Sequence, residues 1–326
     1  MNKHILFQSM LSNQLQGYVD EKKAVGYKFA KGTAMLKRFD VFVQSLILSD
    51  ISLSKELALE WIKRTPNETI TNQCHRISLL RAFAEYMNRM GYPAYVCPKG
   101  MVTVDRYSYT PYIFSKGELK SLLNVCDSFP EEPSSPNRHL VLQLLIRMLY
   151  GCGLRVSEAL SLTIDDVDFM NGTLSIHDTK FGKERIIPMA DSLTERCRNY
   201  AMKIHVGYTG QRPFYPSPHG GHYSSSTIYK LFRDILWQAG ISHTGKGPRL
   251  HDIRHTFAVH CLKKWVLEGR DLTNCLPYLS VYLGHEDMRG SQRYLRLTAD
   301  LYPDITAKVE AICSFVMPEV ETYETD

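Results

Sequence analysis

Three short segments near the C-terminus carry side chains that could act together on a phosphate. His251 and Arg254 lie three residues apart, so on a helix they share one face and place a proton shuttle beside a planar cation. The segment Leu283-Gly284-His285 follows, and Tyr294 lies nine residues after His285. A tyrosine hydroxyl near histidine and arginine suggests covalent attack on a phosphate.

A second arginine lies far upstream in a matching context. Gly151 and Gly153 permit a tight turn, after which Arg155 begins a predicted helix with Glu158 as its i+3 neighbour. If this pair lies at the surface, it would contribute little to stability. The apolar residues around it favour instead a partly buried arginine, and a partly buried charge suggests a functional role.

Two lysines lie in a predicted hairpin turn. Residues 173–177 and 185–188 have the pattern of short strands, and Lys180 and Lys183 lie in the turn between them. Such a tip could reach into a groove or could be a solvated turn, and composition alone favours the solvated turn.

Length and composition predict two globular domains in a cytoplasmic chain. The chain has 326 residues, 44% of them hydrophobic, with no apolar run long enough for a membrane span and no signal-peptide pattern at its start. The eight cysteines include no C-x-x-C pair, so we expect small buried side chains rather than zinc ligands or disulfides.

The charge is unevenly distributed. Residues 1–104 hold 14 Lys and Arg against 8 Asp and Glu, whereas the remainder holds 25 against 26. The acidic C-terminal end contributes to that balance, since no base follows Lys308 and four carboxylates lie in residues 319–326. A basic N-terminal part fits a polyanionic partner, although ordinary surface could give the same excess.

Apolar periodicity predicts a mainly helical chain. We expect about four helices in residues 1–90 and an extended, tyrosine-rich segment over 91–111. Ser115 and Glu118 form a capping box at the start of the next helix. Further helices are predicted at 140–150, 191–202, 224–240, 250–267, 276–283, 291–297 and 305–315.

The ordered set of polar residues, with its local contexts, resembles the catalytic signature of the tyrosine recombinases, also called the phage integrase family. The matching positions are Arg155, Lys180, His251, Arg254, His285 and Tyr294. The hairpin departs from the frequent Gly-Lys-Gly turn, which leaves Lys183 as a lesser candidate for the hairpin lysine. The motifs match over about residues 114–297, and before residue 104 only a small basic helical domain supports the resemblance.

The resemblance implies a mainly α fold with a small antiparallel β-sheet. Residues 1–104 would form a helical-bundle (SAM-like) core-binding domain, 105–111 a linker, and 112–326 the α+β catalytic domain. Tyr294 would be the nucleophile, giving a 3′-phosphotyrosine and a Holliday junction without metal, ATP or other cofactor. Arg155 and Arg254 can neutralise the phosphate, with Glu158 as a supporting residue.

The resemblance assigns protonation of the leaving 5′ oxygen to Lys180 and a hydrogen bond to the phosphate to His285. His251 is our candidate proton acceptor or relay. His255 and His260 on the same helix are interpreted as packing or polar support.

The expected partner is double-stranded DNA carrying a specific recombination site. Two domains would clamp the duplex, and a homotetramer would work on two sites, with accessory recombinase or directionality proteins as further partners. The helix over 305–315 would dock onto a neighbouring copy. A chain that begins at the basic domain favours a transposon, plasmid or chromosome-resolution enzyme, which is cytoplasmic and lies with the nucleoid when bound to DNA.

Two other functions fit parts of the pattern. A related type IB topoisomerase would relax DNA as a monomer, and a relaxation assay without a cognate site would identify it. A DNA-binding protein without activity is the other, although all six active-site positions are filled. Asp165, Asp166 and Asp168 are interpreted as structural rather than as metal ligands.

Overall fold

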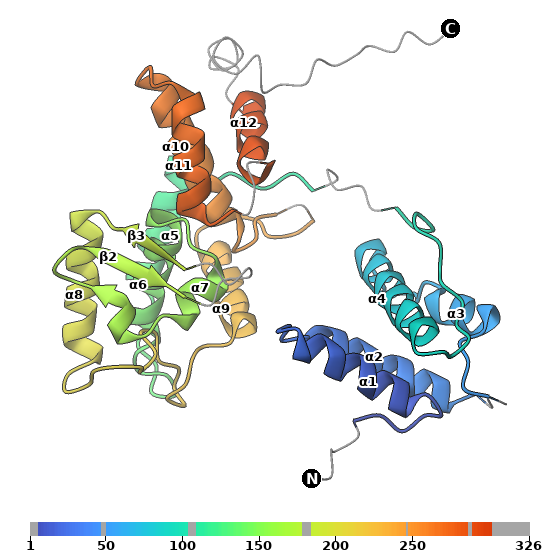
Figure 1. Cartoon of the computed structure of the whole chain (residues 1–326). Coiled ribbons are helices and arrows are strands. Elements are labelled where there is room, and N and C mark those ends of the chain that lie inside the picture. The colour runs from blue at the N-terminus through green and yellow to red at the C-terminus, as the bar shows by residue number, and fades with distance from the viewer. Residues whose placement is uncertain are drawn as a thin grey trace, which may run out of the picture. The chain divides into compact units, whose positions relative to one another are not determined.

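The computed structural model describes residues 6–46, 50–103, 109–177, 184–245, 247–285 and 289–301. The chain forms two compact units, Met1–Tyr109 and Thr110–Asp326 (Figure 1). Both are built mainly of helices, and the second contains a small antiparallel sheet, which confirms the predicted fold class. None of the described helices is long and apolar enough to cross a membrane.

The described residues of the first unit form four helices, as the periodicity predicts. They are α1 (Ser12–Ala24), α2 (Ala30–Gln44), α3 (Lys55–Ile62) and α4 (Ile70–Arg89). Side-chain oxygens of Ser54 and Thr69 cap the first turns of α3 and α4. The apolar faces meet in a core centred on Phe39, Leu80 and Phe83, which are almost fully buried.

The chain after α4 packs back onto the first unit. Leu53 and Ala94 form a parallel bridge, and Arg81 donates hydrogen bonds to the carbonyl oxygens of Cys97 and Pro98. Tyr92 and Tyr95 pack against the core of this unit. These two tyrosines of the predicted extended segment therefore serve packing.

The second unit is organised around one buried helix. Its first helices are α5 (Lys116–Asp127), α6 (Arg138–Gly151), α7 (Val156–Ser161), α8 (Asp191–Ile204) and α9 (Ser225–Gln238). The predicted capping box starts α5, since Ser115 and Glu118 exchange both hydrogen bonds. Helix α6 packs against α5 and α8 and buries four of its five leucines in the core.

A three-stranded antiparallel sheet lies in this unit, with strand order β1-β2-β3. Strands β2 (Thr173–Ile176) and β3 (Arg185–Pro188) were predicted, and Ser175 pairs with Ile186. Strand β1 (Val167–Asp168), after the 3-10 turn η1 (Ile164–Asp166), was not predicted, because two residues are too few to show alternation.

The last helices in the described part of the second unit are α10 (Asp252–Leu267), α11 (Leu272–Leu283) and α12 (Arg289–Leu301). They share an apolar cluster that contains Leu262, Leu279 and Leu295. Helix α11 begins four residues before the predicted 276, because the Asp271 side chain caps it through the backbone N–H of Thr273. Helix α12 begins before Gly290, so this glycine lies inside the helix. The helix predicted over 305–315 falls outside the described residues.

Candidate active site

Arg155 and Glu158 are positioned by the turn between α6 and α7. Gly153 has φ +58°, and a Cβ there would lie 2.4 Å from the Phe257 ring, so the turn needs glycine. Arg155 is the N-cap of α7. Its backbone N donates to Glu158 Oε2 at 2.8 Å, and its Nη1 donates to Glu158 Oε1 at 2.6 Å. The predicted i+3 pair is therefore part of a helix cap.

Glu158 is a buried carboxylate surrounded by arginines. Arg185, at the start of β3, donates from Nη1 to Oε1 at 3.1 Å and from Nη2 to Oε2 at 2.9 Å. Arg254 approaches Oε2 to 3.9 Å. Burial raises the pKa of Glu158, but hydrogen bonds from Arg185 and Arg155 outweigh it and lower that pKa below its usual range. The role of Arg185 was not predicted from the sequence, where its one signal is a cation on a half-buried strand.

Arg254 is 2% exposed and is held by carbonyl oxygens. Its Nη1 donates to the carbonyl oxygen of Gly153 at 2.8 Å, and its Nη2 donates to that of Leu283 at 2.6 Å. Burial lowers the pKa of Arg254 to about 10, so the guanidinium keeps its charge at neutral pH.

The predicted Leu283-Gly284-His285 segment supplies these acceptors at the end of α11. Arg155 Nη2 donates to the carbonyl oxygen of Gly284 at 3.0 Å. The carbonyl oxygen of the preceding residue, Leu283, is the one that Arg254 binds. Gly284 adopts φ +63°, and a Cβ there would lie 2.8 Å from Nη1 of Arg185. This turn therefore brings three arginines and one carboxylate together from α7, β3 and α10.

Tyr294 lies on α12, which packs against α10, and the ring is only 3% exposed. Its hydroxyl lies 3.1 Å from Nδ1 of His255. Its ring stacks on His285 with centroids 5.9 Å apart and an interplanar angle of 23°. Burial raises the pKa of Tyr294, and the charge and hydrogen bond of Arg254 partly oppose that rise. The nucleophile candidate thus lies against the arginine cluster.

Three histidines, His251, His255 and His285, occupy different positions around the Tyr294 hydroxyl. His251 is the N-cap of α10, and its ring meets that of His255 edge-on at 4.8 Å between centroids. Burial lowers the pKa of His251 to about 4 and that of His255 to about 3, so both are neutral at pH 7. His285 Nδ1 lies 2.9 Å from the hydroxyl oxygen of Ser291. From the sequence, His255 was predicted to serve packing or polar support. Its contact with Tyr294 was not predicted, because that contact depends on how α10 and α12 pack.

The hairpin lysines Lys180 and Lys183 fall outside the described residues. The described residues on either side are linked, since His177 Nδ1 lies 3.1 Å from Glu184 Oε1 and its Nε2 lies 3.3 Å from Asp166 Oδ1. Hydrogen bonding to Glu184 raises the pKa of His177. Lys180 therefore remains a predicted member of the site.

The three upstream aspartates have local structural roles. Asp166 accepts from the backbone N and hydroxyl of Thr163, and Asp168 accepts from the backbone N–H groups of Met170 and Asn171. Asp165 accepts from the backbone N of Gly210 at 3.1 Å. Within the described part of the chain, no group of three His, Cys, Asp or Glu residues could hold a metal ion.

Comparison with known proteins identifies the family. The phage integrase family matches residues 113–300. Two Sinorhizobium fredii proteins whose names describe them as integrase/recombinases are similar over most of their length. One, y4rB, is 29% identical over 93% of this chain and 98% of its own, and the other, y4rE, is 30% identical over 90% and 94%.

The fold is similar to that of the XerH site-specific recombinase bound to palindromic difH substrate, with TM-score 0.64 and 18% identity over 90% of this chain and 84% of that one. The chain belongs to the phage integrase family and is a tyrosine-type site-specific DNA recombinase.

Proposed function

We propose that this chain cuts and rejoins DNA at a specific site by forming a 3′-phosphotyrosine on Tyr294, and that two such exchanges pass through a Holliday junction. One observation carries the proposal: the Tyr294 hydroxyl lies 3.1 Å from a neutral imidazole nitrogen and beside the buried guanidinium of Arg254. A nucleophile, a proton acceptor and a phosphate-binding cation would then share one site.

Arg155 and Arg254 would bind the two non-bridging oxygens of the scissile phosphate. Guanidinium groups keep their charge and bind such oxygens through a planar fork of donors. The carbonyl oxygens of Gly153, Leu283 and Gly284 hold the two groups in place before DNA arrives. Charge that is fixed in advance lowers the barrier more than charge that must reorganise during the reaction.

Glu158 and Arg185 would act as positioning residues. The bidentate contact of Arg185 with Glu158, together with the contacts of Arg155, fixes the carboxylate from two sides. Because the arginines balance its negative charge, Glu158 would stay ionised. It would then orient Arg155 and would not carry a proton in the reaction.

The proton of Tyr294 would pass to His255, with His251 as the next group of a relay. The bond from the tyrosine oxygen to phosphorus forms while the bond from phosphorus to the 5′ oxygen breaks. The 5′ oxygen needs a proton to leave, and Lys180 would supply it, with Lys183 as the lesser candidate. His285 would donate a hydrogen bond to the phosphate. The covalent ester conserves the bond energy, so rejoining would need no ATP.

The basic first unit would bind the DNA backbone, and the two units would clamp the duplex. Lysine and arginine contacts with phosphates make such binding fall steeply with added salt. A homotetramer would join two sites, with residues 305–315 docking onto a neighbouring copy. If a chain lacking 304–326 still brings two sites together and cleaves them, this docking role is wrong.

Incubation of the chain with its flanking element DNA, nicked near the crossover, tests the central proposal. Mass spectrometry should find a covalent DNA adduct on Tyr294 in the wild type, also in the presence of a chelator, and none for Tyr294→Phe. An adduct in both proteins would assign the nucleophile to another residue. No adduct with any site tested would favour a protein that only binds DNA.

A further inference from the structure

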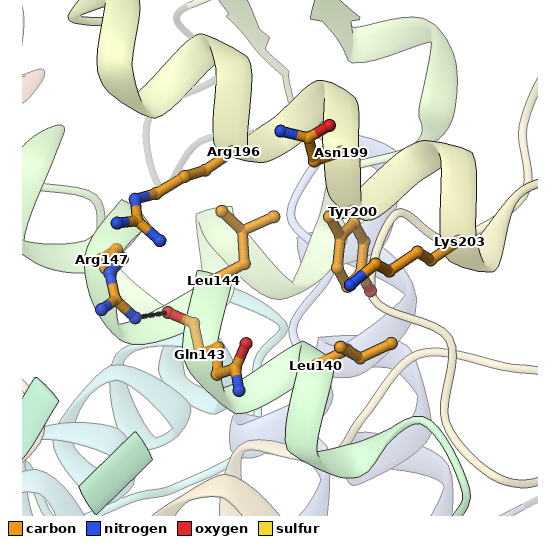
Figure 2. A pocket seen from close by; sticks show the side chains of 8 residues that line it. All are labelled: Leu140, Gln143, Leu144, Arg147, Arg196, Asn199, Tyr200 and Lys203. Atoms are coloured by element: carbon orange, nitrogen blue, oxygen red, sulfur yellow. Dashed lines mark hydrogen bonds between the residues drawn. The ribbon is translucent and has the colours of Figure 1, made fainter. Parts of the chain in front are cut away.

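A basic hollow lies between α6 and α8, apart from the residues of the candidate active site (Figure 2). Its volume is about 160 Å³. Leu140 and Leu144 from α6 and Tyr200 from α8 supply apolar surface, and three cationic side chains line the same hollow: Arg147, Arg196 and Lys203.

Of the three cationic side chains, only that of Arg147 pairs with a carboxylate among the described residues. Arg147 donates to both carboxylate oxygens of Asp127, at 2.8 and 2.7 Å, and to the carbonyl oxygen of Gln143 at 2.9 Å. In the described part of the chain, the exposed side chains of Arg196 and Lys203 have no hydrogen bond or ion pair. The hollow therefore carries about two positive charges without a counter-charge.

The occupant should combine carboxylates with apolar side chains. An anion would relieve repulsion between Arg196 and Lys203, and a small apolar group would cover Leu140 and the buried Tyr200. A DNA backbone offers the negative charge without matching apolar side chains. A short acidic peptide that alternates carboxylates with apolar residues offers both.

We propose that residues 317–326 of the same chain occupy this hollow. This acidic segment carries Glu319, Glu321, Glu324 and Asp326 with no lysine or arginine, and Val320 and Tyr323 lie between the carboxylates. In a chain whose residues 305–315 are not docked on a neighbouring copy, the 16 peptide units from Leu301 to Met317 reach up to about 54 Å when extended.

Because residues 317–326 belong to the same chain as the hollow, weak contacts are enough for them to occupy it. Each exposed ion pair contributes only about 0.2–1 kcal/mol. A segment joined to its site by a short linker, however, has an effective concentration in the millimolar range, so a weak complex is largely formed. The complex is electrostatic, so it should open as salt screens the charges.

Zero-length carbodiimide cross-linking of the full chain, followed by peptide mass spectrometry, tests the proposal. The Lys203 amine should link to Glu319, Glu321 or Glu324 at low salt, and at least tenfold less at about 1 M NaCl. Arg196→Lys keeps the charge and should add a second linked amine. The exposed amines of Lys120 and Lys230, on α5 and α9, are internal controls that should not link to the segment.

Other outcomes would overturn the proposal. Links from Lys203 no more frequent than those from Lys120 and Lys230 would mean that the segment does not occupy the hollow. In a mixture of isotope-labelled and unlabelled protein, links only between the two kinds of chain would assign the hollow to the segment of a second copy. Absence of links, with weaker binding of non-specific duplex by Arg196→Ala/Lys203→Ala, would make the hollow a DNA contact.

Discussion

Glu158 is the one described carboxylate that contacts Arg155, Arg185 and Arg254 together. It is 5% exposed, so its charge is available to the arginines without much competition from water. Three cations held close together repel one another, and this carboxylate reduces the repulsion while leaving net positive charge for a phosphate. The arrangement would bind a phosphate, and it would be strained if its own carboxylate were removed.

Glu158→Gln should therefore destabilise the second unit by about 3 kcal/mol, because it breaks a buried ion pair. Adduct formation should fall as well, since Arg155 loses its orienting partner. Glu195→Gln is a matched control: Glu195 pairs with Arg198 at the surface and should change stability by less than about 1 kcal/mol. Denaturant unfolding measures the first effect, and equal stability of the two variants would contradict it.

His255→Phe should slow formation of the covalent adduct by about 100-fold or more, because it removes the nitrogen beside the Tyr294 hydroxyl and keeps a ring. His260→Phe is the control, since His260 lies on the same helix and its Nδ1 contacts the hydroxyl of Tyr150 instead. If His251→Phe abolishes the adduct and His255→Phe does not, the proton passes to His251 first. Single-turnover rates with a nicked duplex separate these outcomes.

The sequence predicted the site residues that lie inside recognisable motifs. Arg155, Arg254, His285 and Tyr294 lie around one cluster in the structure. Arg185 and His255 could not be assigned contacts from sequence, because their partners Glu158 and Tyr294 lie 27 and 39 residues away. Such contacts depend on how β3 meets α7 and how α10 packs on α12, which local periodicity does not encode.

At the scale of elements, the turn after α11 holds the site together. The carbonyl oxygens of Leu283 and Gly284 accept hydrogen bonds from Arg254 and Arg155, and the absence of a Cβ lets Arg185 lie against the backbone. A helix end normally leaves carbonyl groups without partners inside the helix. Here those carbonyl groups fix the directions of two arginines of the candidate site.

Gly284→Ala should lower both stability and cleavage. A left-handed alanine costs about 1–2 kcal/mol, and its Cβ would displace Arg185, which lies 2.8 Å away. Gly207→Ala carries the same backbone cost, at φ +75°, but has open space around the new methyl group. We therefore expect a larger loss of stability from Gly284→Ala than from Gly207→Ala, with adduct formation reduced only by Gly284→Ala. Equal adduct rates in the two variants would show that the contact with Arg185 is unimportant.

At the scale of the whole molecule, the fold class was predictable because long amphipathic runs and caps determine most of the helices. The four helices of the first unit, the capping box at Ser115 and the strands β2 and β3 agree with the pattern. The early start of α11 was missed because Pro277 and the short cap at Asp271 obscure its first turns. The roles of the two units in binding DNA stay predictions.

Acid should destabilise the second unit through its buried histidines. In the unfolded chain both titrate near 6.5, whereas burial lowers the pKa of His251 to about 4 and that of His255 to about 3. Protons therefore bind the unfolded chain first. This contribution to stability is present above about pH 6.5 and is lost as the pH falls towards 4, by about 1.4 kcal/mol per pH unit for each histidine.

Hydrogen exchange of the α10 amides between about pH 6 and pH 4.5 can measure this slope, after correction for the intrinsic rates. His255→Phe should show a slope smaller by about 1.4 kcal/mol per pH unit than the wild type. An unchanged slope would mean that His255 is protonated in the folded chain.

The burial of Tyr294 has a consequence for how such sequences diverge. Its ring belongs to the apolar cluster shared by α10, α11 and α12, so selection for folding alone would retain it. A descendant that had lost strand cleavage could keep an aromatic ring here for many generations. Arg254 is also retained by the fold, because it is buried and binds the carbonyl oxygens of Gly153 and Leu283. The Arg155 side chain is 21% exposed, and Glu158 keeps Arg185 as a partner when Arg155 is lost. Decay of activity in a lineage should therefore be sought first at Arg155, and only later at Arg254 and Tyr294.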